Sequence, residues 1–413
     1  MPRTLTTVLL LLVSNIAAAG NDWTSFRGSN GDGRSDAKGL PAEFSDSKNV
    51  AWKTAIHGKA WSSPVIAGNQ IWMTTAPQDG KKMYGVCVNR GTGKIIHDLV
   101  IFKNEKPYFC HESNSYATPT PVIDGDRVYL HFGRYGTACL GRQSGKTIWS
   151  RRDLECDHFR APGSSPIVHG NLLVAAYDGV DVQYMVAMNK MTGKTVWRKD
   201  RGIDYGTNNP DRKKAYSTPA VIQFQGRPQL ISPSAVETIS YVPETGEELW
   251  RVRHGGMNAA ARPVFGHGLV YIAAGSGNLS FVAVRPDGKG DVTKSHVVWS
   301  MGKSVPKRSS QILLGNLLFM ISDSGITSCL DAKSGKVRWQ QRIDGSFWAS
   351  PVYADGKIYF SSKEGHVVVV KASPKYELLA ENELESGFNA SPAIVGKALY
   401  LRSFTHLYRI EKK

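Results

Sequence analysis

The chain has 413 residues, 41% of them hydrophobic, and a formal net charge of +16 at pH 7. A net positive charge of this size creates an electrostatic field that favours anionic partners, for example an acidic polysaccharide. Because the chain has no long run of Lys and Arg, a polybasic arm is excluded and specific nucleic-acid binding is not expected.

The first residues have the features of an export signal. Residues 1–19 contain Arg3, an apolar run from Val8 to Val13 and three alanines before a small-residue cleavage site. The apolar run is too short to cross a bilayer, and the rest of the sequence offers no transmembrane segment. No Cys that could carry a lipid anchor lies near the cleavage site. We therefore predict a cleaved signal peptide at 1–19, an N-terminal extension at 20–48 and a periplasmic or secreted protein.

Residues 49–413 contain two markers that repeat in phase, which predicts one domain built from similar units. The first marker reads TGKIIH (92–97), SGKTIW (144–149), TGKTVW (192–197), TGEELW (245–250) and SGKVRW (334–339), and Trp299 fills the widest gap. A period of roughly 40–50 residues is typical of a propeller or solenoid. The second marker is a Pro seven residues before an aliphatic residue, as in Pro64 with Ile71. With two degenerate copies, at Pro219 and Gln311, it occurs eight times.

Short apolar runs separated by Gly and Asn turns lie between these markers, and no stretch has sustained helical periodicity. Each repeat therefore predicts a four-stranded antiparallel sheet, and repeating the sheet around an axis protects its edges. Residues 49–56 carry an outer-strand marker before the first Pro, whereas the chain ends without one. We predict an all-β, eight-bladed β-propeller whose last blade, begun near residue 388, is closed by the N-terminal strand.

The repeats resemble the pyrroloquinoline-quinone (PQQ) type propeller repeat, most closely in AMNKMTGKTVW (187–197) and SCLDAKSGKVRW (328–339). The resemblance covers roughly residues 45–410. It implies that a Trp packs between neighbouring blades while the Gly permits the turn beneath it. That role is carried onto Trp52, Trp149, Trp197, Trp250, Trp299 and Trp339.

Proteins with this repeat include quinoprotein dehydrogenases, with the cofactor over the propeller axis, and scaffolds such as the outer-membrane β-barrel assembly lipoprotein. They also include a secreted subgroup of unassigned activity, which the segment DWTSFRGSNGDG (22–33) resembles.

Two loops of neighbouring repeats, 110–118 and 156–164, concentrate polar side chains at one end of the expected axial channel. Aromatic faces suit sugars, and Arg guanidinium groups suit carboxylate or sulfate. The predicted ligand-binding residues come from these loops and from the corresponding segments of other repeats: His111, Asn114, Tyr116, His158, Arg160, Tyr216, Arg262, Arg308, Trp348 and Asn389. Cys110 and Cys156 lie in the same two loops and could form a disulfide in an oxidising compartment. The two loop histidines lack the spacing of metal ligands, so no metal site is predicted.

Enzyme signatures are sparse. Quinoprotein dehydrogenases typically carry an adjacent Cys pair and acidic calcium ligands, and this sequence has no recognisable counterpart of either. PQQ with calcium is therefore disfavoured, and no cofactor is predicted. The sequence favours a non-catalytic binding or scaffold propeller with an axial site for an anionic or carbohydrate ligand or a protein partner. Its partner would be an anionic polysaccharide or an envelope protein. The alternative is an enzyme, quinoprotein-like or carbohydrate-active, that uses the axial site.

Overall fold

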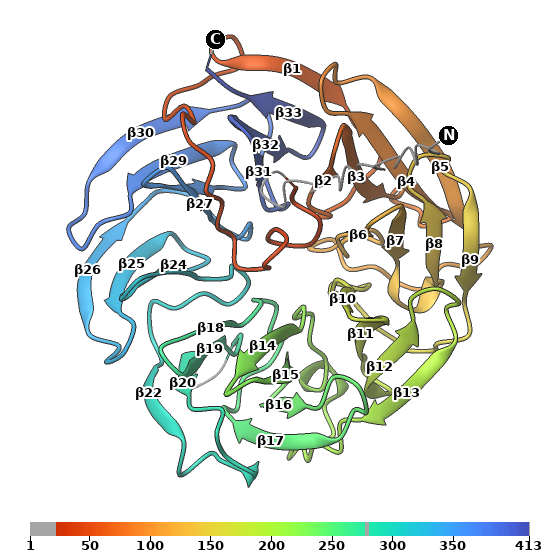
Figure 1. Ribbon diagram of the computed structural model, residues 1–413, viewed down its shortest axis with the longest axis vertical. Coiled ribbons are helices and arrows are strands. Elements are labelled where there is room, and N and C mark those ends of the chain that lie inside the picture. Colours follow the sequence, from red (N-terminus) through yellow and green to blue (C-terminus); the bar gives the residue numbers. More distant parts are fainter. Residues whose placement is uncertain (1–21, 277–280, 413) are drawn as a thin grey trace, which may run out of the picture.

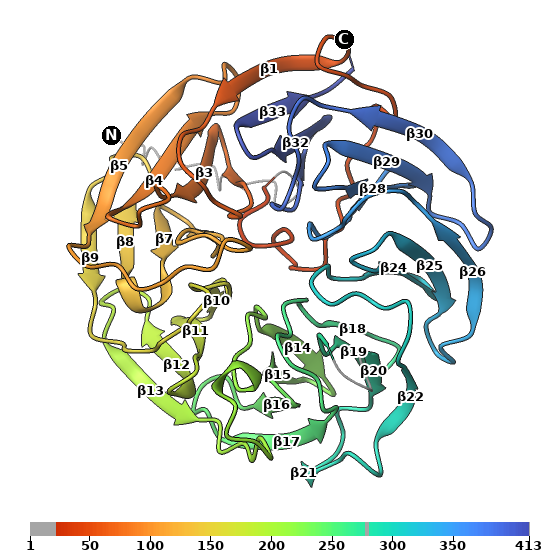
Figure 2. The same ribbon diagram turned by 180° about the vertical axis from the view of Figure 1, so that it is seen from behind.

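The computed structural model describes residues 22–276 and 281–412. The predicted signal peptide, 1–19, lies outside the described residues. The described chain folds into eight sheets arranged around a central axis (Figures 1 and 2). It also contains two short 3₁₀ helices, η1 (Gly133–Tyr135) and η2 (Pro210–Arg212). The predicted all-β, eight-bladed propeller is confirmed. Within the described residues, no helix has the length and apolar character needed to cross a membrane.

Seven blades follow one another along the chain, each running from the inner strand to the outer strand. Blade 1 consists of β2 (Val65–Ala67), β3 (Gln70–Thr75), β4 (Lys82–Asn89) and β5 (Ile95–Lys103). Blade 2 consists of β6 (Val122–Asp124), β7 (Arg127–His131), β8 (Thr137–Gly141) and β9 (Thr147–Arg151). Blade 3 consists of β10 (Ile167–His169), β11 (Leu172–Asp178), β12 (Gln183–Asn189) and β13 (Thr195–Asp200). Blades 4 and 5 consist of β14 (Ala220–Phe224), β15 (Arg227–Pro233), β16 (Glu237–Tyr241) and β17 (Glu248–Arg253); and β18 (Val264–Gly266), β19 (Leu269–Ala273), β20 (Phe281–Val284) and β22 (Val297–Met301). Blades 6 and 7 consist of β23 (Ile312–Leu314), β24 (Leu317–Ile321), β25 (Ile326–Asp331) and β26 (Val337–Arg342); and β27 (Val352–Ala354), β28 (Lys357–Ser361), β29 (His366–Lys371) and β30 (Leu378–Glu383).

Blade 8 joins the two ends of the chain. Its inner strands are β31 (Ala393–Val395), β32 (Ala398–Arg402) and β33 (His406–Ile410), and its outer strand is β1 (Val50–Ala55), which pairs antiparallel with β33 (Figure 1). The predicted closure by the N-terminal strand is confirmed. One detail differs from the four-stranded pattern: β21 (Gly290–Asp291), from an insertion in blade 5, pairs in parallel with β17 and adds a fifth strand to blade 4.

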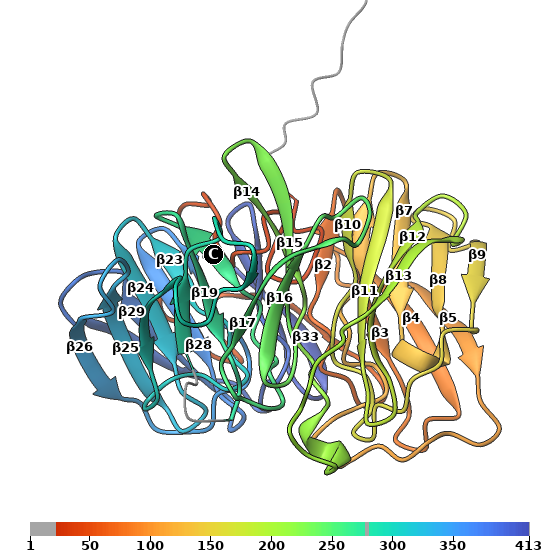
Figure 3. The same ribbon diagram turned by 90° about the horizontal axis from the view of Figure 1, so that it is seen from below.

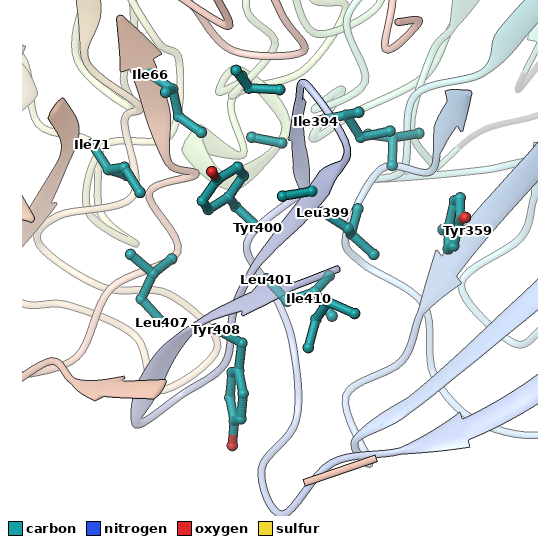
Figure 4. Close-up of a cluster of buried hydrophobic side chains, with 14 of the residues drawn as sticks. Ile66, Ile71, Tyr359, Ile394, Leu399, Tyr400, Leu401, Leu407, Tyr408 and Ile410 are labelled. Atoms are coloured by element: carbon teal, nitrogen blue, oxygen red, sulfur yellow. The ribbon is translucent and has the colours of Figure 1, made fainter. Parts of the chain in front are cut away.

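Apolar side chains of the inner and middle strands fill the spaces between blades. Figure 4 shows one such cluster, in which Leu399 and Tyr400 of blade 8 lie near Ile66 of blade 1 and Tyr359 of blade 7. Because every blade contributes to two such interfaces, the burial that stabilises the ring is distributed around it.

The repeated Trp residues occupy the outer part of these interfaces. The indole N–H of Trp149, in blade 2, donates to the carbonyl of Lys190 in blade 3 at 3.0 Å. Gly193 of blade 3 has φ +74°, and a Cβ there would lie 2.6 Å from the Trp149 ring. Both features of the motif thus have a local cause, since the turn needs positive φ and the indole needs the space that a side chain would fill. Corresponding bonds of 2.9–3.0 Å join Trp52 to Arg90, Trp197 to Pro243, Trp299 to Ala332 and Trp339 to Ser373.

Two blades use variants of this joint. In blade 1, His97 replaces the Trp, and its Nε2 lies 3.0 Å from the carbonyl oxygen of Gln143 in blade 2. In blade 4, the Trp250 indole donates to the side-chain oxygen of Gln229 at 2.9 Å, and the Gln229 amide in turn donates to the carbonyl of Pro286 in blade 5. Trp250 is fully buried, whereas the other five Trp residues of the motif are only partly buried.

The N-terminal extension closes one end of the axial channel. It crosses the centre of the ring before reaching β1 (Figure 1). Trp23 exchanges backbone hydrogen bonds with Ile66 of blade 1, and Arg34 pairs with Tyr353 of blade 7. The buried Arg27 donates to the carbonyls of Gln311 and Pro351, in the segments that lead into blades 6 and 7. Residues 22–48 are therefore part of the folded propeller.

Candidate functional site

A girdle of hydroxyl groups surrounds the axis where the chain enters each inner strand. In the girdle, the backbone N–H of one blade donates to the Ser or Thr hydroxyl of the next, as from Ser63 to Thr120, with distances of 2.9–3.0 Å. The only blade position without a hydroxyl is Arg262, so the girdle has seven links and one gap. The girdle residues are Ser63, Thr120, Ser165, Thr218, Ser310, Ser350 and Ser391.

An axial cavity of about 220 Å³ lies against this girdle. Six of the seven hydroxyl residues line it, and Phe26 of the N-terminal extension also lines it. Because the extension closes the other end of the channel, the cavity opens among the loops that lead into the inner strands. Figure 3 shows those long loops, including the one carrying η2, on the lower side of the ring.

Six of the ten predicted ligand-binding residues line this cavity, from blades on all sides of the axis: Asn114, Arg160, Tyr216, Arg308, Trp348 and Asn389. Asn114 braces the loops. Its amide nitrogen donates to the carbonyls of Arg160, Ala161 and Pro162 at 2.7–3.2 Å, and its oxygen accepts from Thr118 at 2.5 Å. Asn114 therefore fixes the position of Arg160.

Cations gather on two sides of the cavity. On one side, Asp211 lies between Arg160, at 3.7 Å, and Lys214. Burial of Lys214, with the Arg160 charge as a smaller cause, lowers the pKa of Lys214 to about 8. On the other side, Arg308 pairs with Asp323, and both Arg308 and Lys363 lie 4.0 Å from the centroid of the Trp348 ring. Since no Asp or Glu lines the cavity among the described residues, its lining is cationic and polar.

Several polar atoms at the cavity have no protein partner among the described residues. They are Nε of Arg160, the hydroxyl of Tyr216 and the side-chain oxygens of Asn258 and Asn389. Burial also raises the pKa of Tyr216, so its hydroxyl stays protonated and can donate. A buried polar group without a partner is costly, so each of these four side chains has hydrogen-bonding capacity that no described protein group uses.

The other four predicted ligand-binding residues do not line the cavity. His111 bonds to the hydroxyl of Ser113 at 2.8 Å and lines a neighbouring hollow, and Tyr116 donates to the carbonyl of Tyr108 at 2.7 Å. His158 is buried 3.6 Å from the Cys156 sulfur, and burial lowers its pKa to about 4. Arg262 turns to the opposite face, where it donates to the carbonyl of Phe26 at 2.8 Å.

The disulfide considered between Cys110 and Cys156 is absent, because both are free thiols. Cys110 packs against the core between blades 1 and 2, whereas Cys156 belongs to the core between blades 2 and 3. The two sulfur atoms thus point into different interfaces, although their loops are neighbours.

Phe26 lines the cavity and was missed by the sequence analysis, whereas Lys214 lies beside the lining residue Arg160 without lining the cavity itself. The unpartnered acceptor Asn258 stands five residues before Pro263, whereas Tyr216 and Asn389 stand three residues before Pro219 and Pro392, so Ala260 holds the matching repeat position. No sequence pattern places Phe26, because its position depends on a segment that docks across the ring.

The donor set does not fit calcium-dependent quinone chemistry. Calcium takes six to eight oxygen ligands, usually including carboxylates. The cavity lining contributes no carboxylate. The described residues also contain no group of three or more His, Cys, Asp or Glu side chains able to hold a metal.

Comparison with known proteins identifies relatives of this architecture. The family model described as outer membrane protein assembly factor BamB matches residues 42–218, 86–341 and 183–413. The outer membrane protein assembly factor BamB of Legionella pneumophila (strain Paris) is 21% identical over 239 residues, or 58% of this chain and 47% of that protein. The match thus spans about half the length of this curated relative.

Solved structures of both enzymes and BamB share the fold. A europium-containing methanol dehydrogenase superposes with a TM-score of 0.72 at 9% identity, covering 94% of this chain and 91% of the other. A quinohemoprotein alcohol dehydrogenase from Comamonas testosteroni gives 0.71 at 11% identity, covering 95% and 81%. BamB from Moraxella catarrhalis gives 0.63 at 11% identity, covering 87% and 99%. At these identities the likeness concerns the fold alone.

Proposed function

Since the chain belongs to the BamB family, we propose that it is an exported, non-catalytic binding propeller whose axial cavity receives a polar ligand with anionic character. The observation that carries the proposal is the lining of the cavity, in which hydroxyls, amides, two guanidinium groups and an ammonium surround four unpartnered polar atoms. Such a lining suits a polar ligand, and it contains no carboxylate or imidazole group that could act as a general base.

Two features support binding over catalysis. The lining contains no Asp, Glu, His or Cys, the usual residues for proton transfer and covalent catalysis. The two histidines predicted near the axis point elsewhere, and the buried His158 has a pKa of about 4. We assign the alternative, an oxidoreductase like some of the structural neighbours, second place because the site lacks the carboxylates that a calcium-dependent quinone needs.

A thermal-shift screen tests the proposal. Neutral and acidic saccharides, simple carboxylates, PQQ with Ca²⁺ and envelope-protein peptides are tested against the wild type and against Ala260→Trp. Ala260 lines the cavity, so an indole there fills the space without removing a polar group. We expect at least one ligand to raise the melting temperature of the wild type and not that of Ala260→Trp. Mass spectrometry should show that this ligand is chemically unchanged after incubation with the protein. A ligand that stabilises both proteins equally would place binding outside the cavity, and conversion of the ligand would favour the enzyme.

A further inference from the structure

The unpartnered atoms of the axial cavity are arranged as two different sets. Nε of Arg160 and the hydroxyl of Tyr216 are donors and come from the segments before blades 3 and 4. The side-chain oxygens of Asn258 and Asn389 are acceptors and come from the segments before blades 5 and 8. A ligand that satisfies both sets must present an acceptor to the first and hydroxyl donors to the second.

The donor set is built for a negative charge. Tyr216 packs on the loop that carries Arg160, since a Cβ at Gly163 would lie 2.8 Å from Cβ of Tyr216. Lys214 is buried beside Arg160. Two cations, Arg160 and Lys214, therefore share a single carboxylate, Asp211, which leaves excess positive charge beside this wall. A carboxylate bound by guanidinium and phenol hydroxyl would complete these hydrogen bonds.

Two of the four aromatic residues that line the cavity, Trp61 and Trp348, have cations against their rings. Arg308 and Lys363 both lie 4.0 Å from the centroid of the Trp348 ring. Trp61 packs against Phe404 at 5.4 Å between centroids and has Lys59 at 5.4 Å. A neutral sugar would have to displace cation–π contacts in order to stack, whereas an anion would meet the same cations favourably.

From these observations we propose that the axial ligand is a hydroxylated carboxylate on a ring, the chemistry of a uronic acid unit. The inference rests on the proposed function and names its ligand class. The cavity, at about 220 Å³, is smaller than the roughly 300–1,000 Å³ of sites for drug-sized ligands. It therefore receives a single unit, either free or at the end of an acidic polysaccharide, with the carboxylate toward Arg160 and Tyr216 and the hydroxyls toward the two Asn side chains.

Three matched probes test this ligand class. D-Galacturonate has ring, hydroxyls and carboxylate, D-galactose lacks the carboxylate, and cyclohexanecarboxylate lacks the hydroxyls. Their dissociation constants are measured by ligand-observed NMR titration at low salt with the wild type, Arg160→Gln, Asn389→Leu and the control Arg34→Gln, which lies on the opposite face. Digalacturonate, which has a second unit outside the cavity, tests whether a chain end is accepted.

We expect galacturonate to bind at least tenfold more tightly than either partial probe. Arg160→Gln should weaken galacturonate about tenfold or more, as for a lost charged hydrogen bond, and leave galactose unchanged. Asn389→Leu should weaken galacturonate and galactose but not cyclohexanecarboxylate, and Arg34→Gln should change nothing. Each variant is first checked by thermal melting, with Arg160→Lys replacing Arg160→Gln if that variant does not fold.

The contrary outcomes separate the two proposals. The proposed ligand class would be overturned if galactose or cyclohexanecarboxylate bound as tightly as galacturonate, or if galacturonate did not bind. The proposal of an axial binding site would then still be tested by the ligand screen with Ala260→Trp. Galacturonate binding that neither cavity variant weakens would place the ligand elsewhere and contradict the axial site itself.

Discussion

The joint between blades 2 and 3 allows packing and backbone strain to be measured separately. Gly193 has φ +74°, and a Cβ at this position would lie 2.6 and 2.8 Å from atoms of the Trp149 ring. Gly170, in the turn between β10 and β11, has φ +53° with no atom within 4 Å of the corresponding Cβ position. The two glycines share the strained backbone but differ in whether a side chain would meet a neighbour.

Gly193→Ala should therefore lose more stability than Gly170→Ala. A residue with a Cβ at positive φ costs roughly 1–2 kcal/mol, which both variants pay. Only Gly193→Ala also forces a methyl group into the indole, and overpacking of this kind costs about 1–3 kcal/mol. We expect a difference of about 1–3 kcal/mol between the variants in urea denaturation, compared through midpoints at an unchanged slope.

The double variant Trp149→Ala with Gly193→Ala completes the test. Removing the indole relieves the overlap, so the combined loss of unfolding free energy should be smaller than the sum of the single losses. Equal losses for Gly193→Ala and Gly170→Ala, together with additivity in the double variant, would refute the account of how neighbouring blades dock.

Three further predictions follow from burial and topology. Trp250→Ala should lower the free energy of unfolding by about 3–5 kcal/mol, as for a fully buried aromatic side chain. Trp197→Ala should lower it less, because Trp197 is only partly buried. Equal losses in urea denaturation would contradict this prediction. Deleting residues 20–56 should abolish soluble expression, because the deletion exposes the edge of β33, and a truncated protein that melts like the full chain would disprove the closure. Because burial holds the pKa of His158 at about 4, below the ordinary value of about 6.5, stability should fall as the pH drops from about 6.5 toward 4, by up to about 1.4 kcal/mol per unit. That figure is the contribution of His158 alone, because burial also lowers the pKa of His131 and of His254 to about 3. His158→Gln should therefore lower the slope without removing it, and an unchanged slope in acid titration of the unfolding free energy would count against the prediction.

The blades were predictable because each repeats the same local pattern. The Pro marker, the TG turn and the Trp fix the start, the turn and the outer strand of a blade within about 50 residues, so phase counting gave eight blades and the closing strand. The insertion that supplies β21 breaks the repeat, and nothing in a glycine-rich stretch indicates which neighbouring sheet it will join.

The candidate site was less predictable because side-chain direction in irregular loops depends on distant contacts. Arg160 and His158 are two residues apart, yet Arg160 lines the cavity while His158 packs into the core beside Cys156. Arg262 stands where other blades carry a girdle hydroxyl, but its guanidinium bonds to the carbonyl of Phe26 and faces away from the cavity. That contact joins positions 236 residues apart, a separation that local patterns do not report.

A crystal structure of the protein grown with digalacturonate tests the central claim most directly. We predict density in the axial cavity, with a carboxylate at Arg160 and Tyr216 and sugar hydroxyls at Asn258 and Asn389. Density for the sugar only at the outer rim or at the face covered by the N-terminal extension, with the axial cavity free of it, would contradict the account.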